Sequence, residues 1–495
     1  MLIIIVLFIC GILLEKYGSH KIPHMNRHFL ISASFFFAVV VYVIFTLHGD
    51  SMISSSRDAA DIWKTITSFH TKNIYGSYVL YKGINSVYPY IWLYDFSVIL
   101  NVNEWTFIKI FYCGAFAYTA AIGFPNMIEF LTNQETKLYR RFLFVVAMWY
   151  FGYYSCAYTQ LMVDLPCLMY YVLLINAALK LFRKKKGILR YVWAGLLSGL
   201  CMSASGQYTM PAICIAIFIF WITYKSEQDW KKRFQMLLVR FAPFLLCIGL
   251  VVGIDFYFES CIVNPLRQEG AWIPTGDDWL QAGLIRFNET YRQGGNASSL
   301  PSYRNAAILH DYYGENLVNI SAVTVEEYVH IFLKYPMDFI LNFLNSFFLI
   351  LSPDHGSFNF IPLSIFYTLL FCSIYIGLTK CKTWEKIFSP LFFIGFSFLW
   401  ATVPMLVMNI EPRTCLQIQG LIMSLALCDG TIWENIHSVL MNIQKNGRKE
   451  FLRKMNRISY PVLFYIIFLC ICLMHIATLY EALGTDTQGI LINLK

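Results

Sequence analysis

The sequence predicts an all-α polytopic membrane protein with about twelve transmembrane helices. Of its 495 residues, 57% are hydrophobic and 14% charged, whereas soluble domains have about 45–50% apolar and about 25% charged residues. Long apolar runs recur along the whole chain, and short basic clusters separate them. Because every backbone polar group in lipid must be hydrogen-bonded within the protein, such runs are expected to form helices.

Each apolar run long enough to approach the thickness of a bilayer is an expected span. The expected spans are residues 1–15, 29–47, 105–124, 142–158, 160–181, 190–206, 209–224, 238–256, 361–379, 388–408, 413–428 and 459–480. No basic residue precedes the first run and no small-residue cleavage site follows it, so we expect a retained first helix instead of a signal peptide.

The basic residues predict the orientation of these helices, because short cytoplasmic loops of membrane proteins carry the excess of Lys and Arg. Alternate crossings place every cluster on one face, which is therefore expected to be cytoplasmic. The clusters are Lys16/Lys21/Arg27, Lys137/Arg140/Arg141, Arg183/Lys184/Lys185/Lys186, Lys231/Lys232/Arg233, Lys380/Lys382/Lys386 and Arg448/Lys449/Arg453/Lys454/Arg457.

The same alternation predicts three parts of the chain. Residues 1–256 form an N-terminal transmembrane module that includes an outer loop at 48–104, and residues 361–495 form a C-terminal transmembrane module. Between them, 257–360 is a large outer loop of mixed composition. The apolar stretch 87–101 and the amphipathic stretch 326–352 are expected to be interfacial or re-entrant helices, because a crossing there would break the charge pattern.

Several function classes are excluded by the absence of their sequence patterns. The formal net charge of +8 comes from dispersed clusters and not from one basic stripe, so no nucleic acid partner is expected. Most of the 14 cysteines lie inside apolar runs, and no zinc-like spacing of Cys and His occurs. No P-loop, dinucleotide-binding glycine pattern, zincin helix or nucleophile elbow is present.

Two acidic residues occupy positions where a carboxylate can carry chemistry. Asp50 follows the second apolar run directly and starts the outer loop, where it can act as a base or can be a solvated residue at a helix end. Asp164 lies within an apolar run near its expected outer end. An ionised side chain inside a membrane costs about 2.5–3.5 kcal/mol on insertion scales, so we favour a functional role for Asp164.

Further candidates lie on the same expected outer face. Glu411-Pro412-Arg413 forms a tight turn between two apolar runs. There Arg413 can bind a phosphate through two hydrogen bonds and Glu411 can orient it, although simple snorkelling of the arginine fits equally well. Arg57 begins an amphipathic stretch whose charges suit a solvated face, and Gln207 lies in a short outer loop.

The order of several short motifs resembles the GT-C superfamily of membrane glycosyltransferases, in particular the bacterial relatives of protein mannosyltransferases and aminoarabinose transferases. Each motif is short, and the resemblance rests on their order over most of the chain. The motifs are Gly49-Asp50-Ser51, Tyr88-Pro89-Tyr90, Asp164-Leu165-Pro166, Ala194-Gly195 at the beginning of a helix, Tyr335-Pro336 at the beginning of a later helix, and Glu411-Pro412-Arg413.

The resemblance implies an inverting hexosyl- or pentosyltransferase of the cell envelope, located in a bacterial cytoplasmic membrane. It would move a sugar from a polyprenyl-phosphate donor to a glycan, lipid or protein acceptor on the outer face. Asp50 would be the catalytic base, and Arg413 with Glu411 would bind the donor phosphate. Asp164, Arg57, Tyr88 and Gln207 would line the substrate cavity. A divalent cation, Mg²⁺ or Mn²⁺, is a candidate cofactor, with Asp50 and Asp164 as candidate ligands.

Two other functions fit the same residues. A transporter or lipid flippase would use Asp164 and Arg413 as ligands for its substrate or for an ion. A polymerase or ligase of lipid-linked glycans would share the substrates of a GT-C enzyme without this order of motifs.

Overall fold

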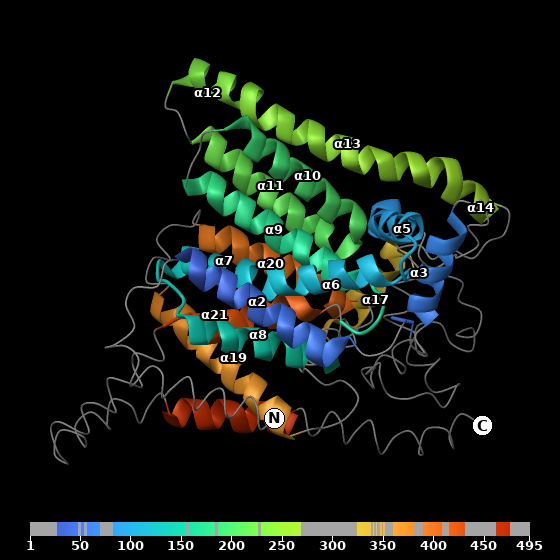
Figure 1. The fold of residues 1–495 in the computed structure, drawn as a ribbon. Helices are drawn as coiled ribbons and strands as arrows, with labels where there is room; N and C mark the ends of the chain where they lie inside the picture. The colour runs from blue at the N-terminus through green and yellow to red at the C-terminus, as the bar shows by residue number, and fades with distance from the viewer. Residues whose placement is uncertain are drawn as a thin grey trace, which may run out of the picture. The chain divides into compact units, whose positions relative to one another are not determined.

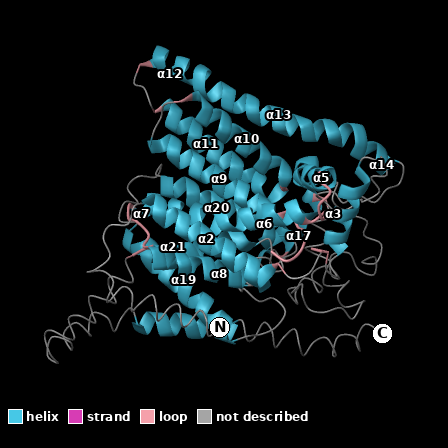
Figure 2. Ribbon diagram, in the orientation of Figure 1, coloured by secondary structure: helices cyan, strands magenta, loops and turns pink. Residues whose placement is uncertain are grey.

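The computed structural model describes the larger part of the chain, and no strand occurs among the residues described (Figure 2). These residues are 27–47, 51–53, 57–69, 83–154, 158–183, 187–225, 229–268, 324–337, 340, 343, 347–348, 350–351, 360–380, 390–407, 415–430 and 462–475. The expectation of an all-helical protein is confirmed for this part of the chain.

The helices follow one another with short connections through most of the N-terminal half (Figure 1). They are α2 (Arg27–Thr46), α3 (Arg57–Ser68), α5 (Ile84–Ile99), α6 (Thr106–Tyr118), the π-helix η2 (Thr119–Gly123), α7 (Phe124–Thr132), α8 (Leu138–Tyr154), α9 (Asp164–Arg183), α10 (Ile188–Ala204), the 3₁₀ turn η3 (Gly206–Tyr208) and α11 (Thr209–Tyr224).

One long helical run comes next, and the later helices are separated from one another along the sequence. The long run comprises α12 (Trp230–Met236), the π-helix η4 (Leu237–Phe241), α13 (Ala242–Phe258), the π-helix η5 (Glu259–Val263) and α14 (Asn264–Gln268). The later helices are α17 (Val325–Lys334), α19 (Phe360–Lys380), α20 (Pro390–Val407), α21 (Leu416–Cys428) and the helix Val462–His475.

Every expected span except 1–15, which lies outside the described residues, overlaps one of these helices. Among the described residues, five helical runs are long and apolar enough to cross a membrane: Arg27–Thr46, Thr106–Thr132, Asp164–Arg183, Gly206–Tyr224 and Trp230–Val263. The total of about twelve crossings stays a prediction.

Some helix boundaries differ from the expected ones. The helix expected at 105–124 continues to Thr132 because the π-helix η2 prolongs it without a break. The span expected at 238–256 is part of a longer run that begins at Trp230. The expectation that Ala194-Gly195 begins a helix is wrong, because α10 already starts at Ile188. Apolar patterns do not report such ends, since a helix continues wherever its backbone hydrogen bonds do.

Contacts divide the chain into two compact units, which are described separately. Unit 1 contains residues 1–273, 379–401 and 427–430, and unit 2 contains the remainder. In unit 2, the Thr368 and Tyr465 hydroxyls share a hydrogen bond of 2.8 Å. Ser373 donates a bond of 2.6 Å to the Ile422 carbonyl. These bonds join α19 to the helix Val462–His475 and to α21, and they satisfy hydroxyls within an apolar environment.

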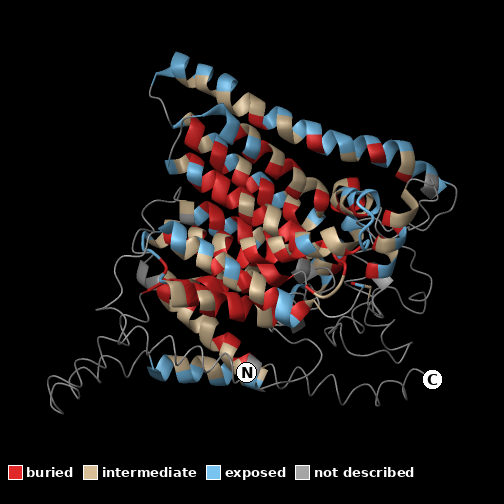
Figure 3. Ribbon diagram, in the orientation of Figure 1, coloured by how far each residue is buried: buried red, intermediate tan, exposed pale blue. Residues whose placement is uncertain are grey.

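Burial differs strongly between the helices of unit 1 (Figure 3). In an 18-residue apolar stretch of α9, 72% of the residues are buried. In the corresponding stretch of the run Trp230–Val263, only 11% are buried. The exposed side chains of this run are large and apolar, for example Leu246 at 73% and Phe256 at 72% exposure. A contiguous apolar surface of this kind is typical of helices that face lipid or a partner.

Glycines allow α10 and α13 to pack closely along their length (Figure 1). A Cβ atom on Gly195 would lie 2.4 Å from the Phe244 carbonyl oxygen, and one on Gly199 would lie 2.7 Å from the Val251 Cβ. The two glycines are four residues apart and therefore share one face of α10. This small-xxx-small spacing is the usual means by which membrane helices bring their backbones together.

We predict that Gly199→Val destabilises the protein by about 1–3 kcal/mol, because the added atoms overlap Val251. Gly253→Val is the matched control, since Gly253 lies on α13 with nothing within 4 Å of the new Cβ. Thermal unfolding of the purified protein in detergent measures both variants. Equal melting temperatures for the two variants would contradict this packing.

Candidate functional site

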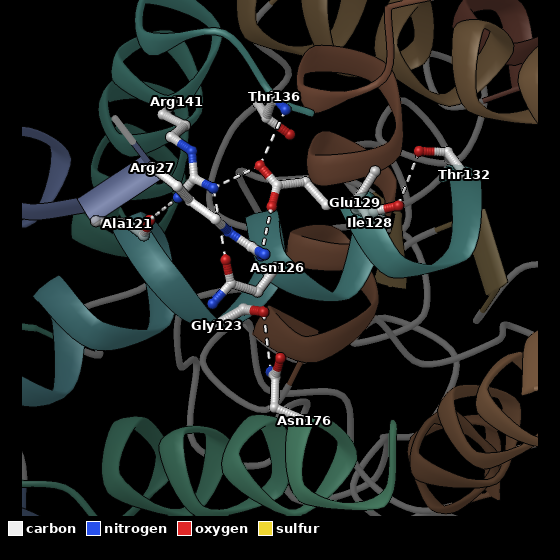
Figure 4. Close-up of polar contacts among 10 residues, drawn as sticks. All are labelled: Arg27, Ala121, Gly123, Asn126, Ile128, Glu129, Thr132, Thr136, Arg141 and Asn176. Carbon is white, nitrogen blue, oxygen red and sulfur yellow. Dashed lines mark hydrogen bonds and ion pairs between the residues drawn. The ribbon is translucent and has the colours of Figure 1, made fainter. Parts of the chain in front are cut away.

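A buried carboxylate joins three helix ends at one side of unit 1 (Figure 4). Glu129 near the end of α7 forms ion pairs with Arg27 at 3.1 Å and with Arg141 at 2.6 Å. Arg27 begins α2 and Arg141 lies in the first turn of α8. The ends of these three helices therefore lie at the same level, in agreement with the alternation expected from the sequence. We call this side the basic end.

Hydrogen bonds complete the environment of these charges. Glu129 also accepts a bond of 2.9 Å from the backbone N–H of Thr136. The guanidinium of Arg141 donates a bond of 2.8 Å to the carbonyl of Ala121, which lies within the π-helix η2. Arg141 has only 1% of its side chain exposed. Its charge is therefore balanced mainly by Glu129, because water has almost no access to it.

We predict that Glu129→Gln destabilises the fold by about 3–5 kcal/mol, because it leaves the Arg141 charge buried without its carboxylate. Glu135→Gln removes an exposed carboxylate six residues away and is expected to have almost no effect. The midpoint of thermal unfolding in detergent compares the two variants. A stability loss of the same size in both would mean that the ion pair contributes little.

The opposite side of unit 1, which we call the acidic end, contains the segments that follow α2 and α8. The Tyr42 hydroxyl donates a hydrogen bond of 2.9 Å to the carbonyl of Tyr158. The backbone N–H of Leu161 donates a bond of 3.0 Å to the carbonyl of Met52. These contacts hold the chain after α2 against the chain that leads into α9. Asp164, the first residue of α9, therefore lies at the acidic end, and Arg183 ends the same helix at the basic end.

Two tyrosine hydroxyls hold the backbone just before Asp164. The Tyr112 hydroxyl accepts a hydrogen bond of 2.6 Å from the Met162 N–H and also contacts its carbonyl oxygen. The Tyr90 hydroxyl donates a bond of 2.8 Å to the same carbonyl and lies 3.2 Å from the Tyr112 hydroxyl. Burial raises the pKa of Tyr90 well above its ordinary value, so this hydroxyl remains protonated and keeps its hydrogen-bonding role.

Asp164 itself is half-buried at the N-terminus of the most buried of the long apolar helices. Its carboxylate lies near Tyr112 on α6 and Tyr208 at the end of η3. The positive end of the α9 dipole favours a carboxylate at this position. Pro166 lies in the first turn, where its missing N–H breaks no helical hydrogen bond.

We predict that Tyr112→Phe lowers stability by about 1–3 kcal/mol, because the buried Met162 N–H then lacks its acceptor. Tyr257→Phe removes a hydroxyl from an exposed tyrosine and is the control. Thermal unfolding of both variants checks the prediction. It fails if Tyr112→Phe unfolds at the same temperature as the parent protein.

The other sequence-predicted site residues fall into two groups. Gln207 lies at the acidic end, where its side-chain amide donates a bond of 3.1 Å to the Ala401 carbonyl on α20. Tyr88 lies on α5, 39% exposed, and its ring packs near Trp92. Arg57 begins α3. Asp50, Glu411 and Arg413 lie outside the described residues, so their meeting with Asp164 stays a prediction.

A second acidic residue at the acidic end was not selected from the sequence. Asp255 on α13 accepts a hydrogen bond of 3.0 Å from the backbone N–H of Asn85. The Asn85 side chain donates bonds of 3.0 Å to Ser203 on α10 and 3.1 Å to the Val251 carbonyl. Gly83, with a φ of 85°, lets the chain enter α5 close to this group. The sequence did contain a signal for Asp255, because it is an acidic residue inside an apolar run. The same criterion selected Asp164.

Among the described residues, no group of three or more His, Cys, Asp or Glu side chains has a geometry that could hold a metal ion. Of the two candidate metal ligands Asp50 and Asp164, only Asp164 is among the residues that the structure describes.

Comparison of the chain with protein-family models, with curated proteins and with solved structures gave no match.

Proposed function

We propose that this chain is a multi-pass membrane glycosyltransferase that moves a sugar from a polyprenyl-phosphate carrier to an acceptor at the outer face of a bacterial cytoplasmic membrane. The observation that carries the proposal is the position of Asp164. It is an acidic residue at the end of unit 1 opposite the basic end, on a deeply buried helix and beside a pair of hydrogen-bonded tyrosines.

This position suits a lipid-linked substrate. The phosphate of such a donor lies at the membrane surface while its prenyl chain lies among the helices, so the bond to be broken is at the level of helix ends. Asp164 lies at such a level, as does Gln207. Arg27, Arg141 and Arg183 lie at the other end of these helices. By the distribution of Lys and Arg, that other end is cytoplasmic and the acidic end is outside.

The proposed reaction is a single displacement. Asp50 accepts the proton of the acceptor hydroxyl, whose oxygen forms a bond to the anomeric carbon. The bond between that carbon and the phosphate oxygen breaks, and polyprenyl phosphate leaves with the electron pair. Attack from the face opposite the leaving group inverts the anomeric centre. Arg413, oriented by Glu411, binds the departing phosphate through two hydrogen bonds.

The remaining candidates are proposed to line the substrate cavity. Asp164 and Gln207 would contact the sugar or the acceptor, with Arg57 and Tyr88 at the entrance from the outer loop. A divalent cation, Mg²⁺ or Mn²⁺, would supply additional charge for the leaving phosphate, and carboxylates such as those of Asp50 and Asp164 are its usual ligands. The steps above require only residues of the chain itself.

We predict that Asp50→Asn lowers sugar transfer by about 100-fold or more, because general acid–base groups contribute about 10²–10⁴-fold. Asp164→Asn is expected to lower transfer less, because it removes a contact to the substrate and not the base. Membranes containing each variant are incubated with a panel of synthetic polyprenyl-phosphate sugars. Released polyprenyl phosphate and the glycosylated product are both measured. Asp61→Asn on α3 is the control, because it removes a carboxylate that we assign to the solvated face of the same outer loop. Full activity of Asp50→Asn would remove Asp50 from the mechanism.

A transporter or flippase is the second candidate function. It is favoured by the π-helices η2, η4 and η5 within two of the long helical runs. Such turns are frequent at functional sites, and transporters have their substrate sites within their membrane-crossing helices. Counterflow of a lipid-linked sugar in proteoliposomes, without formation of any glycosidic product or free polyprenyl phosphate, would support this function and exclude the transferase.

A further inference from the structure

A cavity of about 680 Å³ lies at the basic end of unit 1. Its walls come from the start of α2, the helical run α6–α7, the second half of α9 and the first turns of α10. It is separate from the acidic end, because Lys180 and Arg183 lie four to five turns along α9 from Asp164. None of the residues assigned to the proposed transferase site lines it.

Four cationic side chains line this cavity, and no carboxylate does so among the residues described: Arg27, Lys180, Arg183 and Arg190. Lys180, Arg183 and Arg190 are exposed. Within the described part of the chain, neither Lys180 nor Arg183 has a carboxylate at ion-pair distance. Glu129 balances part of the Arg27 charge, and it shares its own charge with Arg141 (Figure 4). Among the residues that the structure describes, the charges of Lys180 and Arg183 therefore have no acidic partner.

An aromatic ring positions one of these cations. The guanidinium carbon of Arg183 lies 4.3 Å from the centre of the Phe130 ring. This contact holds the guanidinium, which is a planar set of five N–H donors, at the side of the cavity. A phosphate is the anion whose oxygens match such a planar set of donors.

Most of the remaining wall is apolar, and Asn126 and Asn176 are its uncharged polar members. Leu173, Ala177 and Lys180 line the cavity at a spacing that places them on one face of α9. They cover about 10 Å along the helix axis. Leu189 and Trp193 line it from α10, one turn apart, with 78% and 51% of their surfaces exposed. A cationic rim joined to an exposed apolar wall suits a molecule with a charged head and a hydrocarbon chain better than a small soluble anion.

We propose that this cavity binds the phosphate headgroup of an anionic phospholipid from the cytoplasmic leaflet. Lys180, Arg183 and Arg190 contact the phosphate, and an acyl chain lies against Leu189 and Trp193. The charge distribution places this end of unit 1 at the cytoplasmic surface, where anionic lipids collect and basic pockets between helices bind their headgroups. The inference requires that the chain lies in a membrane and does not depend on sugar transfer.

The test measures lipid retention. The full chain is purified in a mild detergent, freed of lipid, and mixed with phosphatidylglycerol or with phosphatidylcholine before native mass spectrometry. We expect the parent protein to retain phosphatidylglycerol in preference to phosphatidylcholine. In Lys180→Gln/Arg183→Gln this retention should fall by about tenfold or more, because two cations near the headgroup are removed.

A matched double variant controls for the loss of charge. Lys231→Gln/Arg233→Gln also removes one lysine and one arginine. The guanidinium carbon of Arg233 likewise lies 4.3 Å from the centre of an aromatic ring, that of Tyr224. Neither residue lines the cavity. We expect this control to retain phosphatidylglycerol as the parent protein does. Equal losses in the two double variants would overturn the proposal, because retention would then reflect only general surface charge.

Two further measurements keep the result interpretable. Lys180→Glu replaces one exposed side chain at the cavity rim, and it should lower retention even if the double variant folds poorly. In the second, inorganic phosphate is added at millimolar concentration to the lipid-loaded protein. Retention that is unchanged by phosphate supports a lipid. Complete displacement of the lipid by phosphate, or the same thermal stabilisation by phosphate alone, would overturn it in favour of a soluble anion.

Discussion

The buried ion pairs of Glu129 are the constraint on which the arrangement of unit 1 depends. Where water has almost no access, an unpaired charge costs several kcal/mol, so Glu129 and Arg141 must remain together. Arg27 reaches the same carboxylate from a position 102 residues away. Helices α2, α7 and α8 therefore cannot slide along one another without breaking these pairs. Because α2 and α8 have similar lengths, 20 and 17 residues, aligning them at one end also sets the level of their other ends.

The two ends of these helices differ in chemistry. At the acidic end, Asp164 and Asp255 lie among hydroxyls and amides whose hydrogen bonds join α5, α6, α9, α10 and α13. At the basic end, arginines and lysines surround a cavity that contains an apolar wall. A sugar carrier and an anionic phospholipid both present phosphate at the membrane surface. The proposed transferase site and the proposed lipid site would bind them at opposite ends of the same helices.

Close packing allows these polar groups to stay in place. At η2 the helix widens, and the Gly123 carbonyl accepts a hydrogen bond of 3.0 Å from the Asn176 side chain on α9. A Cβ on Gly123 would lie 2.4 Å from Val172, so α9 can approach only because this residue is glycine. The same holds for Gly199 on α10 facing Val251. At η2, a side-chain amide thus takes the place of water as the hydrogen-bond partner of a backbone carbonyl.

The sequence by itself determined the helical class, the position of most helices and the separation of basic from acidic ends. These properties follow from hydropathy and charge along one dimension, because a bilayer selects apolar runs and the basic loops between them. It also singled out Asp164, since an acidic residue in an apolar run is conspicuous. Asp255 meets the same criterion, because it also lies in an apolar run. Its partners Asn85 and Ser203 lie 170 and 52 residues away in the sequence.

Only the tertiary structure decided which helix faces meet. The apolar pattern gave no reason to expect that Arg141 pairs with Glu129, that the Tyr112 hydroxyl bonds to Met162 fifty residues later, or that Gly199 faces Val251. A membrane helix is apolar on nearly all sides, so its hydropathy does not distinguish the face toward lipid from the face toward a neighbour. That distinction comes from close contacts and paired polar groups, which exist only once the helices have packed.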